Sequence, residues 1–456
     1  MPLKPADAVE RAKTMHELHV TERKKLDTIR RFYRGRQSLP AAIKSGSPHE
    51  VKVMAASSRV NVMPIVVNSL VQSAFVEGFR DSDGQIDEEI WRVWQANRMD
   101  ARQSAIHRAA AQYNAAYAVV LPGDPLPVIR PVSPRNLTTL YGGDPSWPMS
   151  ALERADKNLF KLYDETSEYW IQGGEKPWLF LEQRDHNLGV TPVVRFRDED
   201  DLDADDEPSS EITATGRTRY DDLPTGGQVA PLVPLQDQID LATFGLQVAQ
   251  HFGAFRQRYI IGWVADDETA LLKMGASQIW TIDEDPDKVK IDDLESTDLK
   301  GYIDSRESSL RHAATLSQTP AHELVGSLIN MSAEALAAAE ASKDRKVEER
   351  TTLWGEAHEQ VLWAAGQYMS IDVDLNSQVV WRDTSARAFS ATVDALGKLS
   401  QMLGVPPQEL WERIPGVTQD DVKRWKETAA SGDAFAHLTA MLDAQQPSAP
   451  TEPQTT

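Results

Sequence analysis

Cysteine is absent from the 456-residue sequence. Disulfide bonds, thiolate catalysis and cysteine-ligated zinc or iron–sulfur centres are therefore excluded. The common nucleotide-binding and hydrolase motifs are missing as well: there is no G-x-x-x-x-G-K-S/T loop, no G-x-S-x-G elbow and no H-E-x-x-H helix. We therefore expect a protein that has no enzyme activity and that uses no cofactor and no metal.

Positive charge is scarce. The chain has 48 Lys and Arg against 69 Asp and Glu, which gives a net charge of −21. Because phosphate binding relies on Lys and Arg, this balance argues against a broad basic face that grips nucleic acid. It is compatible with a protein that stays soluble at high copy number or that repels DNA.

Long apolar runs are also lacking. The N-terminal residues have no apolar core of the signal-peptide type. The most apolar runs, Pro64–Phe79 and Ala109–Leu121, are too short or too polar to cross a bilayer. We therefore predict no membrane contact, and we place the protein in a cytoplasm or in a particle assembled there.

Periodicity predicts an α+β fold that is mainly helical. Apolar residues in 6–33 recur at intervals of three or four, as on an amphipathic helix. From Ala115 to Phe196, short alternating segments are separated by turn residues, as in an antiparallel sheet. Further elements are expected as follows: a strand at Val51–Val53, a buried helix at Val60–Phe79, and a helix from Asp87 that breaks near Met99–Asp100.

Two residue pairs on these helices have a spacing that a ligand could use. His16 and His19 could hold a metal, and Trp91 and Trp94 could stack on a ligand. The alternatives are a solvated helix surface for the histidines and a packed core for the tryptophans. We favour these two alternatives.

An acidic run interrupts the pattern after the predicted sheet. Asp198 to Glu207 holds eight carboxylates in ten residues, and Pro, Ser, Thr and Gly follow it. This composition predicts a solvated, mobile loop. The alternative is a divalent-metal site, which would need the carboxylates to be fixed at converging positions.

The next helix carries almost no charge. Pro234 to Phe255 contains no Lys or Arg, and Asp237 and Asp240 are its acidic residues. A helix of this kind is usually buried among neighbours, and we expect equivalent helices from other subunits to surround it. A second helix is predicted at Asp298–Leu316.

The stretch from Ser317 to Tyr368 combines a loop with a very long helix. Pro320, Gly326 and Asn330 are turn residues, and a run rich in Ala, Glu, Lys, Arg and Leu follows them. At about 1.5 Å per residue, this helix would extend roughly 50 Å and would bridge regions or pack against copies of itself. Its narrow apolar face is predicted to serve packing; it consists of Val347, Trp354 and Val361.

The order of several motifs resembles the portal proteins of tailed phages, in particular those of the siphophage class. The resemblance covers roughly residues 5–430, and segment 190–366 is its specific part. The motifs that carry it are Pro192–Phe196, Pro234–Asp240, Tyr259–Gly262, Thr319-Pro320, Leu324, Gly326, Asn330 and Ser332–Leu336.

The resemblance implies a portal fold with wing, stem, clip and crown regions, assembled as a ring that usually has twelve subunits. The implied regions are a wing at 1–190, an acidic flexible linker into the stem at 191–233, a stem helix at 234–255, a clip at 256–295, a second stem helix at 296–316, a tunnel loop at 317–331, a long helix and further wing at 332–403, a crown at 404–442 and a disordered tail at 443–456.

The resemblance also implies a function and partners. The ring would sit at a capsid vertex of the virion, assemble in the host cytoplasm, and serve DNA packaging, head–tail connection and DNA ejection. Double-stranded DNA would pass through it, and its partners would be the terminase large subunit, head–tail connector or adaptor proteins, and the major capsid and scaffolding proteins. The alternative function is a metal-dependent nuclease or hydrolase that uses carboxylates from the acid-rich segments.

The resemblance points to two sets of site residues. Apolar tunnel-loop residues could touch DNA without holding phosphates, or they could pack against the neighbouring subunit's loop; both alternatives stay open. The tunnel-loop set is His322, Glu323, Leu324, Val325, Ser327, Leu328, Ile329 and Asn330, and the stem set is Gln236, Asp237 and Asp240.

Overall fold

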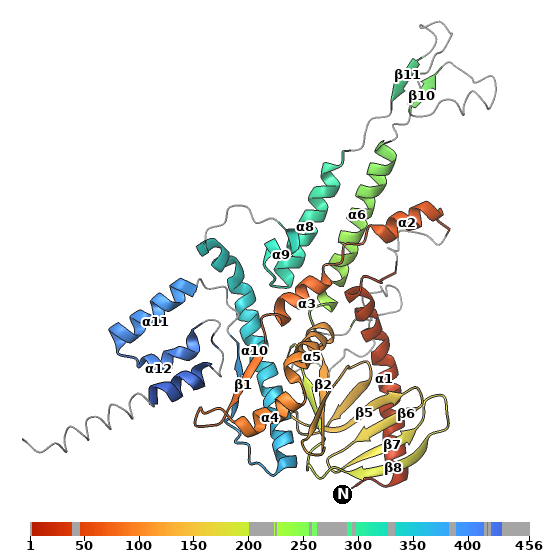
Figure 1. Ribbon diagram of the computed structural model, residues 1–456. Coiled ribbons are helices and arrows are strands. Elements are labelled where there is room, and N and C mark those ends of the chain that lie inside the picture. Colours follow the sequence, from red (N-terminus) through yellow and green to blue (C-terminus); the bar gives the residue numbers. More distant parts are fainter. Residues whose placement is uncertain are drawn as a thin grey trace, which may run out of the picture.

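The chain folds into a body of sheets and helices from which a pair of antiparallel helices projects (Figure 1). This computed structural model describes residues 2–38, 46–199, 223, 226–254, 258–261, 290–293, 298–326, 333–382, 389–414, 417 and 421–430. The projecting pair is α6 (Val233–Ala254) and α8 (Lys300–Leu316), and a short two-stranded sheet lies at its far end. The C-terminal helices lie to one side of the body (Figure 1).

The remaining helices agree largely with the predicted ones. They are α1 (Pro5–Tyr33), α2 (His49–Ser57), α3 (Met63–Val71), α4 (Glu88–Ala96), α5 (Met99–Tyr113), the 3-10 turn η1 (Ala230–Leu232), α9 (Ala321–Val325), α10 (Ala333–Met369), α11 (Phe389–Leu403), α12 (Pro407–Leu410) and the 3-10 turn η2 (Trp411–Arg413); residues 421–430 are also helical. The predicted helix break is confirmed between α4 and α5, where Arg98 has a left-handed backbone. At the start of α4, the Asp87 side chain accepts a hydrogen bond from the backbone N–H of Ile90.

All strands of the described residues pair antiparallel, which confirms the prediction for Ala115–Phe196. They are β1 (Val76–Arg80), β2 (Ala116–Leu121), β3 (Val128–Val132), β4 (Leu137–Tyr141), β5 (Pro148–Asp156), β6 (Leu159–Tyr163), β7 (Ser167–Gln172), β8 (Leu179–Asp185), β9 (Val193–Phe196), β10 (Arg258–Ile261), β11 (Lys290–Asp293) and β12 (Gln378–Trp381). Among the described residues they form sheets of order β4-β5-β6-β7-β8, β3-β2-β9, β1-β12 and β10-β11.

Two local predictions are wrong. Val51–Val53 lies within α2, not in a strand, and α2 packs against α6. The predicted helix Val60–Phe79 ends at Val71, because Val76–Arg80 pairs with β12 from about 300 residues later in the chain. Periodicity reports only local neighbours, so it could not reveal that pairing.

One large hydrophobic core joins α1, α3, α4, α5, the β3-β2-β9 sheet and α10. The heptad face of α10 lies in this core: Trp354 and Val361 are fully buried and Val347 packs at its edge. The predicted packing role of that face is therefore confirmed. A smaller core forms where the first half of α1 covers the five-stranded sheet.

A pair of buried histidines lies inside the large core. Nε2 of His107 and Nε2 of His358 are 2.9 Å apart, and both side chains are fully buried. His107 stacks on Trp354, with ring centroids 4.5 Å apart. Burial in this aromatic setting lowers the pKa of His107 to about 3 and holds the pKa of His358 well below its usual value.

None of the described helices combines the length and the apolar composition that crossing a bilayer requires.

Candidate functional site

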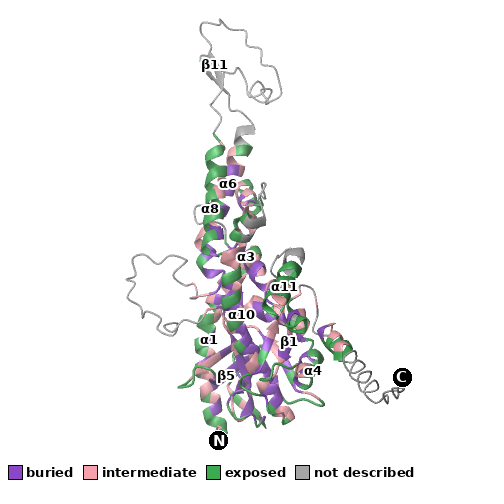
Figure 2. Ribbon diagram, turned by 90° about the vertical axis from the view of Figure 1, so that its left-hand side faces the viewer, coloured by how far each residue is buried: buried purple, intermediate pink, exposed green. Residues whose placement is uncertain are grey.

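The projecting helix pair is held at close range by a glycine. A Cβ atom at Gly245 of α6 would lie 2.7 Å from Cε1 of Tyr302 in α8, so the tyrosine ring lies directly against the α6 backbone. Much of both helices is exposed in the single chain (Figure 2). Exposed apolar side chains on the pair include Leu241, Ile303 and Leu316. The expectation that other subunits cover this surface stays a prediction.

The base of α6 is tied to the body by Gln236 and Asp240, both of which are buried. The Asp240 carboxylate accepts hydrogen bonds from Gln37 Nε2 at 2.7 Å, from the Val60 N–H at 3.2 Å and from Gln236 Nε2 at 2.9 Å. Burial raises the pKa of Asp240, and these hydrogen bonds oppose that rise. The third predicted stem residue, Asp237, is half-buried.

The predicted tunnel loop begins as an ordered turn. The Ser317 hydroxyl donates to the carbonyl oxygen of Ala313 at 2.7 Å, and the Thr319 N–H donates to the carbonyl oxygen of Ala314 at 3.0 Å. The short helix α9 follows and ends at Gly326, whose φ of 72° is left-handed.

The four predicted tunnel residues that the structure describes differ in their surroundings. Leu324 is 8% exposed within the large core and Val325 packs against that core, so these two pack within their own chain, which is neither of the two alternatives. His322 and Glu323 are half-buried, and Glu323 forms an ion pair with Lys343 at 3.0 Å. The other four lie outside the described residues: Ser327, Leu328, Ile329 and Asn330.

Three cations on α10 face this turn and the base of the projecting pair. Lys343, Lys346 and Arg350 are spaced by three and four residues, which places them on one side of the helix. We call them the cation row. Lys346 and Arg350 are both buried. Sequence reasoning missed the row, because three cations in a Lys/Arg/Glu-rich helix look like a solvated face.

Lys346 contacts the base of both helices of the projecting pair. Its Nζ donates a hydrogen bond to the carbonyl oxygen of Ser317, just after α8, at 2.7 Å. It also donates to Oε1 of Gln228, just before α6. The Gln228 amide in turn donates to Oδ2 of Asp198 at 2.5 Å. This chain of contacts fixes the start of α6 and the end of α8 against α10.

Asp198 corrects the interpretation of the acidic run. Its side chain is 0% exposed, and its Oδ1 lies 3.4 Å from Nε of Arg350. The prediction of a solvated loop is therefore wrong for this residue, because the buried Arg350 draws the first carboxylate of the run inside. Glu199 is half-exposed and also contacts Arg350, at 3.3 Å. The run from 200 to 207 lies outside the described residues.

Burial shifts the pKa values of Asp198 and Lys346 in this cluster, although the nearby opposite charges oppose these shifts. Desolvation raises the pKa of Asp198 to about 6, while Arg350 and the Gln228 hydrogen bond counteract it. Desolvation lowers the pKa of Lys346 to about 8, and the Asp198 charge counteracts that change. Both groups are therefore mainly charged at pH 7, and the cluster acts as a clamp between chain segments.

The other candidate pairs turn out to be packing residues. His19 is buried and bonds through Nε2 to the carbonyl oxygen of Pro134 at 3.0 Å, so its predicted place on a solvated surface is wrong. Trp94 is fully buried, as expected of a core residue, and stacks on Trp91. Within the described part of the chain, no three His, Asp or Glu residues gather as a metal site would require.

Comparison with known proteins gives matches over most of the chain. A family model described as "Phage portal protein, SPP1 Gp6-like" matches residues 13–433. The chain is 26% identical to the portal protein of Mycobacterium phage D29 over 438 residues, which covers 88% of this chain and 85% of the relative. It is also 26% identical to the portal protein of Mycobacterium phage L5 over 463 residues, which covers 91% and 89% of the two chains.

A solved structure is similar at lower identity. A chain from the virion of a native gene transfer agent particle has a TM-score of 0.47 and 12% identity, covering 82% of this chain and 99% of that one.

The family match includes the projecting pair, the turn at Ser317 and the whole of α10. The matched family and the two mycobacteriophage relatives are portal proteins, and they give no support to the nuclease alternative. The chain belongs to the phage portal protein family.

Proposed function

We propose that twelve copies of this chain form a ring at one capsid vertex, and that DNA enters and leaves the head through it. The family match over residues 13–433 carries this proposal. The number twelve follows from the ring size usual in the family. The virion is the place of function, and assembly takes place in the host cytoplasm.

The regions of the ring follow the order of the elements. Helices α6 and α8 form the stem, and the segment between them, 256–295, forms the clip at the far end of the pair. Segment 317–331 is the tunnel loop, residues 404–442 are the crown, and the body is the wing. The projection of α6 and α8 from the body supports the stem assignment (Figure 1).

The cation row gives this assignment a mechanical basis. Lys346 holds both stem helices at their bases, and Lys343 holds α9 through Glu323. Segment 327–332 connects Gly326 to the start of α10. In the ring, we assign contact with the passing DNA to this connection.

The charge of the chain suits such a conduit. With −21 on each subunit, a ring presents a repulsive wall to the DNA phosphates, so the duplex can slide without being held. The chain itself performs no catalysis. Its partners are the terminase large subunit and later the head–tail connector proteins at the clip, and the major capsid and scaffolding proteins around the wing.

The mass of the purified protein tests the ring. Twelve copies of 50.7 kDa give about 600 kDa by light scattering, and negative-stain images should contain rings with a central hole. A stable monomer that cleaves DNA only with divalent cations would contradict the ring and support the nuclease alternative.

A further inference from the structure

A groove of about 320 Å³ lies beside the C-terminal half of α10. Its lining comes from α10, from the turn before β12 and from the connection between β4 and β5. The side chains that matter for its chemistry are Trp147, Trp363, Leu375, Glu356, Glu359 and Asp374.

Part of the apolar lining is open to solvent, although Phe79 and Val373 are buried. The rings of Trp147 and Trp363 are half-buried, with centroids 5.6 Å apart and planes inclined at 54°. Leu375 is 91% exposed at the edge of the same groove. Two tilted indole faces beside an exposed leucine offer an apolar contact surface that the chain itself leaves uncovered.

The charge of the lining has one sign. Glu356, Glu359 and Asp374 contribute carboxylates, and no Lys or Arg lines the groove. Glu359 accepts a hydrogen bond from the Val379 N–H at 3.1 Å, and Asp374 accepts hydrogen bonds from Asn376. None of the three carboxylates forms an ion pair with a described cation of the chain.

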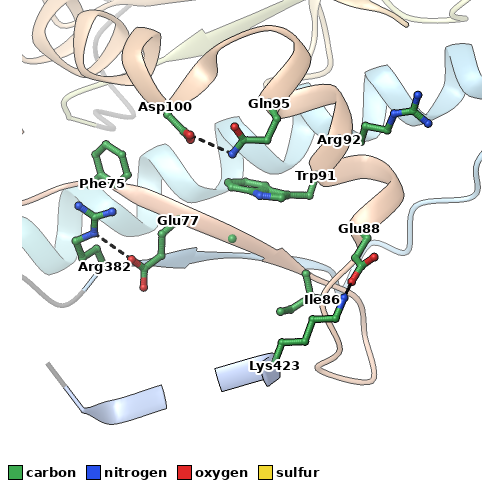
Figure 3. A pocket seen from close by; sticks show the side chains of 11 residues that line it. Phe75, Glu77, Ile86, Glu88, Trp91, Arg92, Gln95, Asp100, Arg382 and Lys423 are labelled. Carbon is green, nitrogen blue, oxygen red and sulfur yellow. Dashed lines mark hydrogen bonds and ion pairs between the residues drawn. The ribbon is translucent and has the colours of Figure 1, made fainter. Parts of the chain in front are cut away.

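In a second pocket, by contrast, the carboxylates have partners within the chain. This pocket, of about 650 Å³, is lined by Trp91 and by charges of both signs. Glu77 pairs with Arg382 and Glu88 pairs with Lys423 (Figure 3). Its third carboxylate, Asp100, accepts hydrogen bonds from Trp94 and Gln95, so every carboxylate in this lining already has a partner within the chain.

Some other aromatic rings of the described chain have a cation of the chain over their faces. Lys161 lies over Trp170 at 4.0 Å, and Arg195 lies over Tyr141 at 4.2 Å. No described Lys or Arg lies over the indoles of the groove. A guanidinium or ammonium group placed there would meet indole faces and carboxylates together, a combination that strengthens both interactions when water is excluded.

We propose that this groove binds a segment of a partner protein that carries Arg or Lys next to an apolar side chain. The cation enters between the indoles and the carboxylates of Glu356 and Glu359, and the apolar side chain covers Leu375. Every lining residue belongs to one chain, so the groove needs no second copy in order to form.

A library of random short peptides, displayed and selected on the purified assembled protein, tests the chemistry. We expect enrichment of Arg or Lys beside Leu, Ile or Phe. One enriched peptide, labelled with fluorescein, is then compared by anisotropy with the same peptide carrying citrulline, a neutral analogue of Arg, in its place. Binding should weaken by about tenfold without the charge, and high salt should weaken it as well.

Variants link the binding to the groove. The double variant Glu356→Gln/Glu359→Gln keeps the acceptor for Val379 and should bind the peptide about tenfold more weakly. Leu375→Ser should also weaken binding, and it should leave stability unchanged because the side chain is exposed. The matched control is Glu348→Gln, an exposed carboxylate on the same helix, which should leave binding unchanged.

Three results would overturn the proposal: a selection without enrichment of cations, equal affinity for the citrulline peptide, or equal affinity of the groove variants. Benzoylphenylalanine at position 375 gives a further check by photo-crosslinking of the purified protein. A cross-link to a second copy would mean that the groove is an interface between subunits, and the partner proposal would fail.

Discussion

Nζ of Lys346 lies 2.7 Å from the carbonyl oxygen of Ser317, the residue that ends α8. The same ammonium group donates to Gln228 just before α6, so one buried cation on α10 connects both helices of the stem pair. The two contacts span 29 and 118 residues of sequence. Because a buried acceptor that loses its donor is costly, this lysine should matter more than its place on a charge-rich helix indicates.

Replacing Lys346 by Met should loosen the base of the stem. The carbonyl oxygen of Ser317 and the amide oxygen of Gln228 would lose a buried donor, at about 2 kcal/mol of unfolding free energy. Urea unfolding measures that loss, and amide hydrogen exchange should accelerate at Ala313–Ser317. Lys398→Met is the control, since its exposed pair with Asp394 should contribute under ~0.5 kcal/mol. An equal loss of unfolding free energy in the two variants would contradict the clamp role of Lys346.

A larger side chain at position 245, combined with a smaller one at position 302, tests the contact between Gly245 and Tyr302. Gly245→Leu should force the ring of Tyr302 away, destabilise the pair by roughly 1–3 kcal/mol and reduce the mass measured by light scattering. Adding Tyr302→Ala should restore much of both. Gly301→Leu is the control, because a Cβ there meets nothing within 4 Å. If the double variant is no better than Gly245→Leu alone, the two helices do not meet as described.

Mutations in two parts of the predicted tunnel loop should have different effects. Replacing Ser327–Asn330 by Gly and Ser should leave rings intact and impair DNA packaging, because these residues would touch DNA and not the core. Leu324→Ala should instead lower the unfolding free energy by about 3 kcal/mol, because Leu324 is buried. Packaging assays and urea unfolding distinguish the two. Loss of rings in the 327–330 variant would show that this segment joins subunits.

The histidine pair predicts loss of stability in acid. The pKa of His107 is lowered from 6.5 to about 3 by burial, and that of His358 also lies well below 6.5. Below pH 6.5, both histidines therefore become protonated in the unfolded chain while they stay neutral in the folded chain. Stability is fully present above pH 6.5 and falls below it, by about 1.4 kcal/mol per pH unit for each histidine.

Unfolding free energy measured against pH checks this expectation. The double variant His107→Leu/His358→Leu should have a flatter slope between pH 6.5 and pH 4, whatever its absolute stability. His49→Gln, a change at an exposed histidine, should leave the slope as it is. A wild-type slope that survives in the double variant would assign the acid sensitivity to other groups, such as His19 and His186, whose pKa values burial also lowers.

Local pattern was enough for the elements that carry their own signal. The helix from Ala333 to Met369 follows from composition, and α6 agrees with the helix predicted to begin at Pro234. The antiparallel strands between Ala116 and Phe196 follow from alternation and turn residues. The order of motifs along the chain also pointed to the portal family. The helix and strand signals lie within a few residues of one another in the sequence, whereas the motif order extends over segment 190–366.

The chain by itself therefore determined most of the helices, the strand-rich region and the family. Only the tertiary structure decided that Asp198 is buried, that β1 pairs with β12, and that the cation row clamps the stem. The physical reason is the range of the interaction: Arg350, the partner of Asp198, and β12, the partner of β1, each lie more than a hundred residues away in the sequence. Nothing in the local sequence distinguishes a carboxylate that meets a buried arginine from one that meets water.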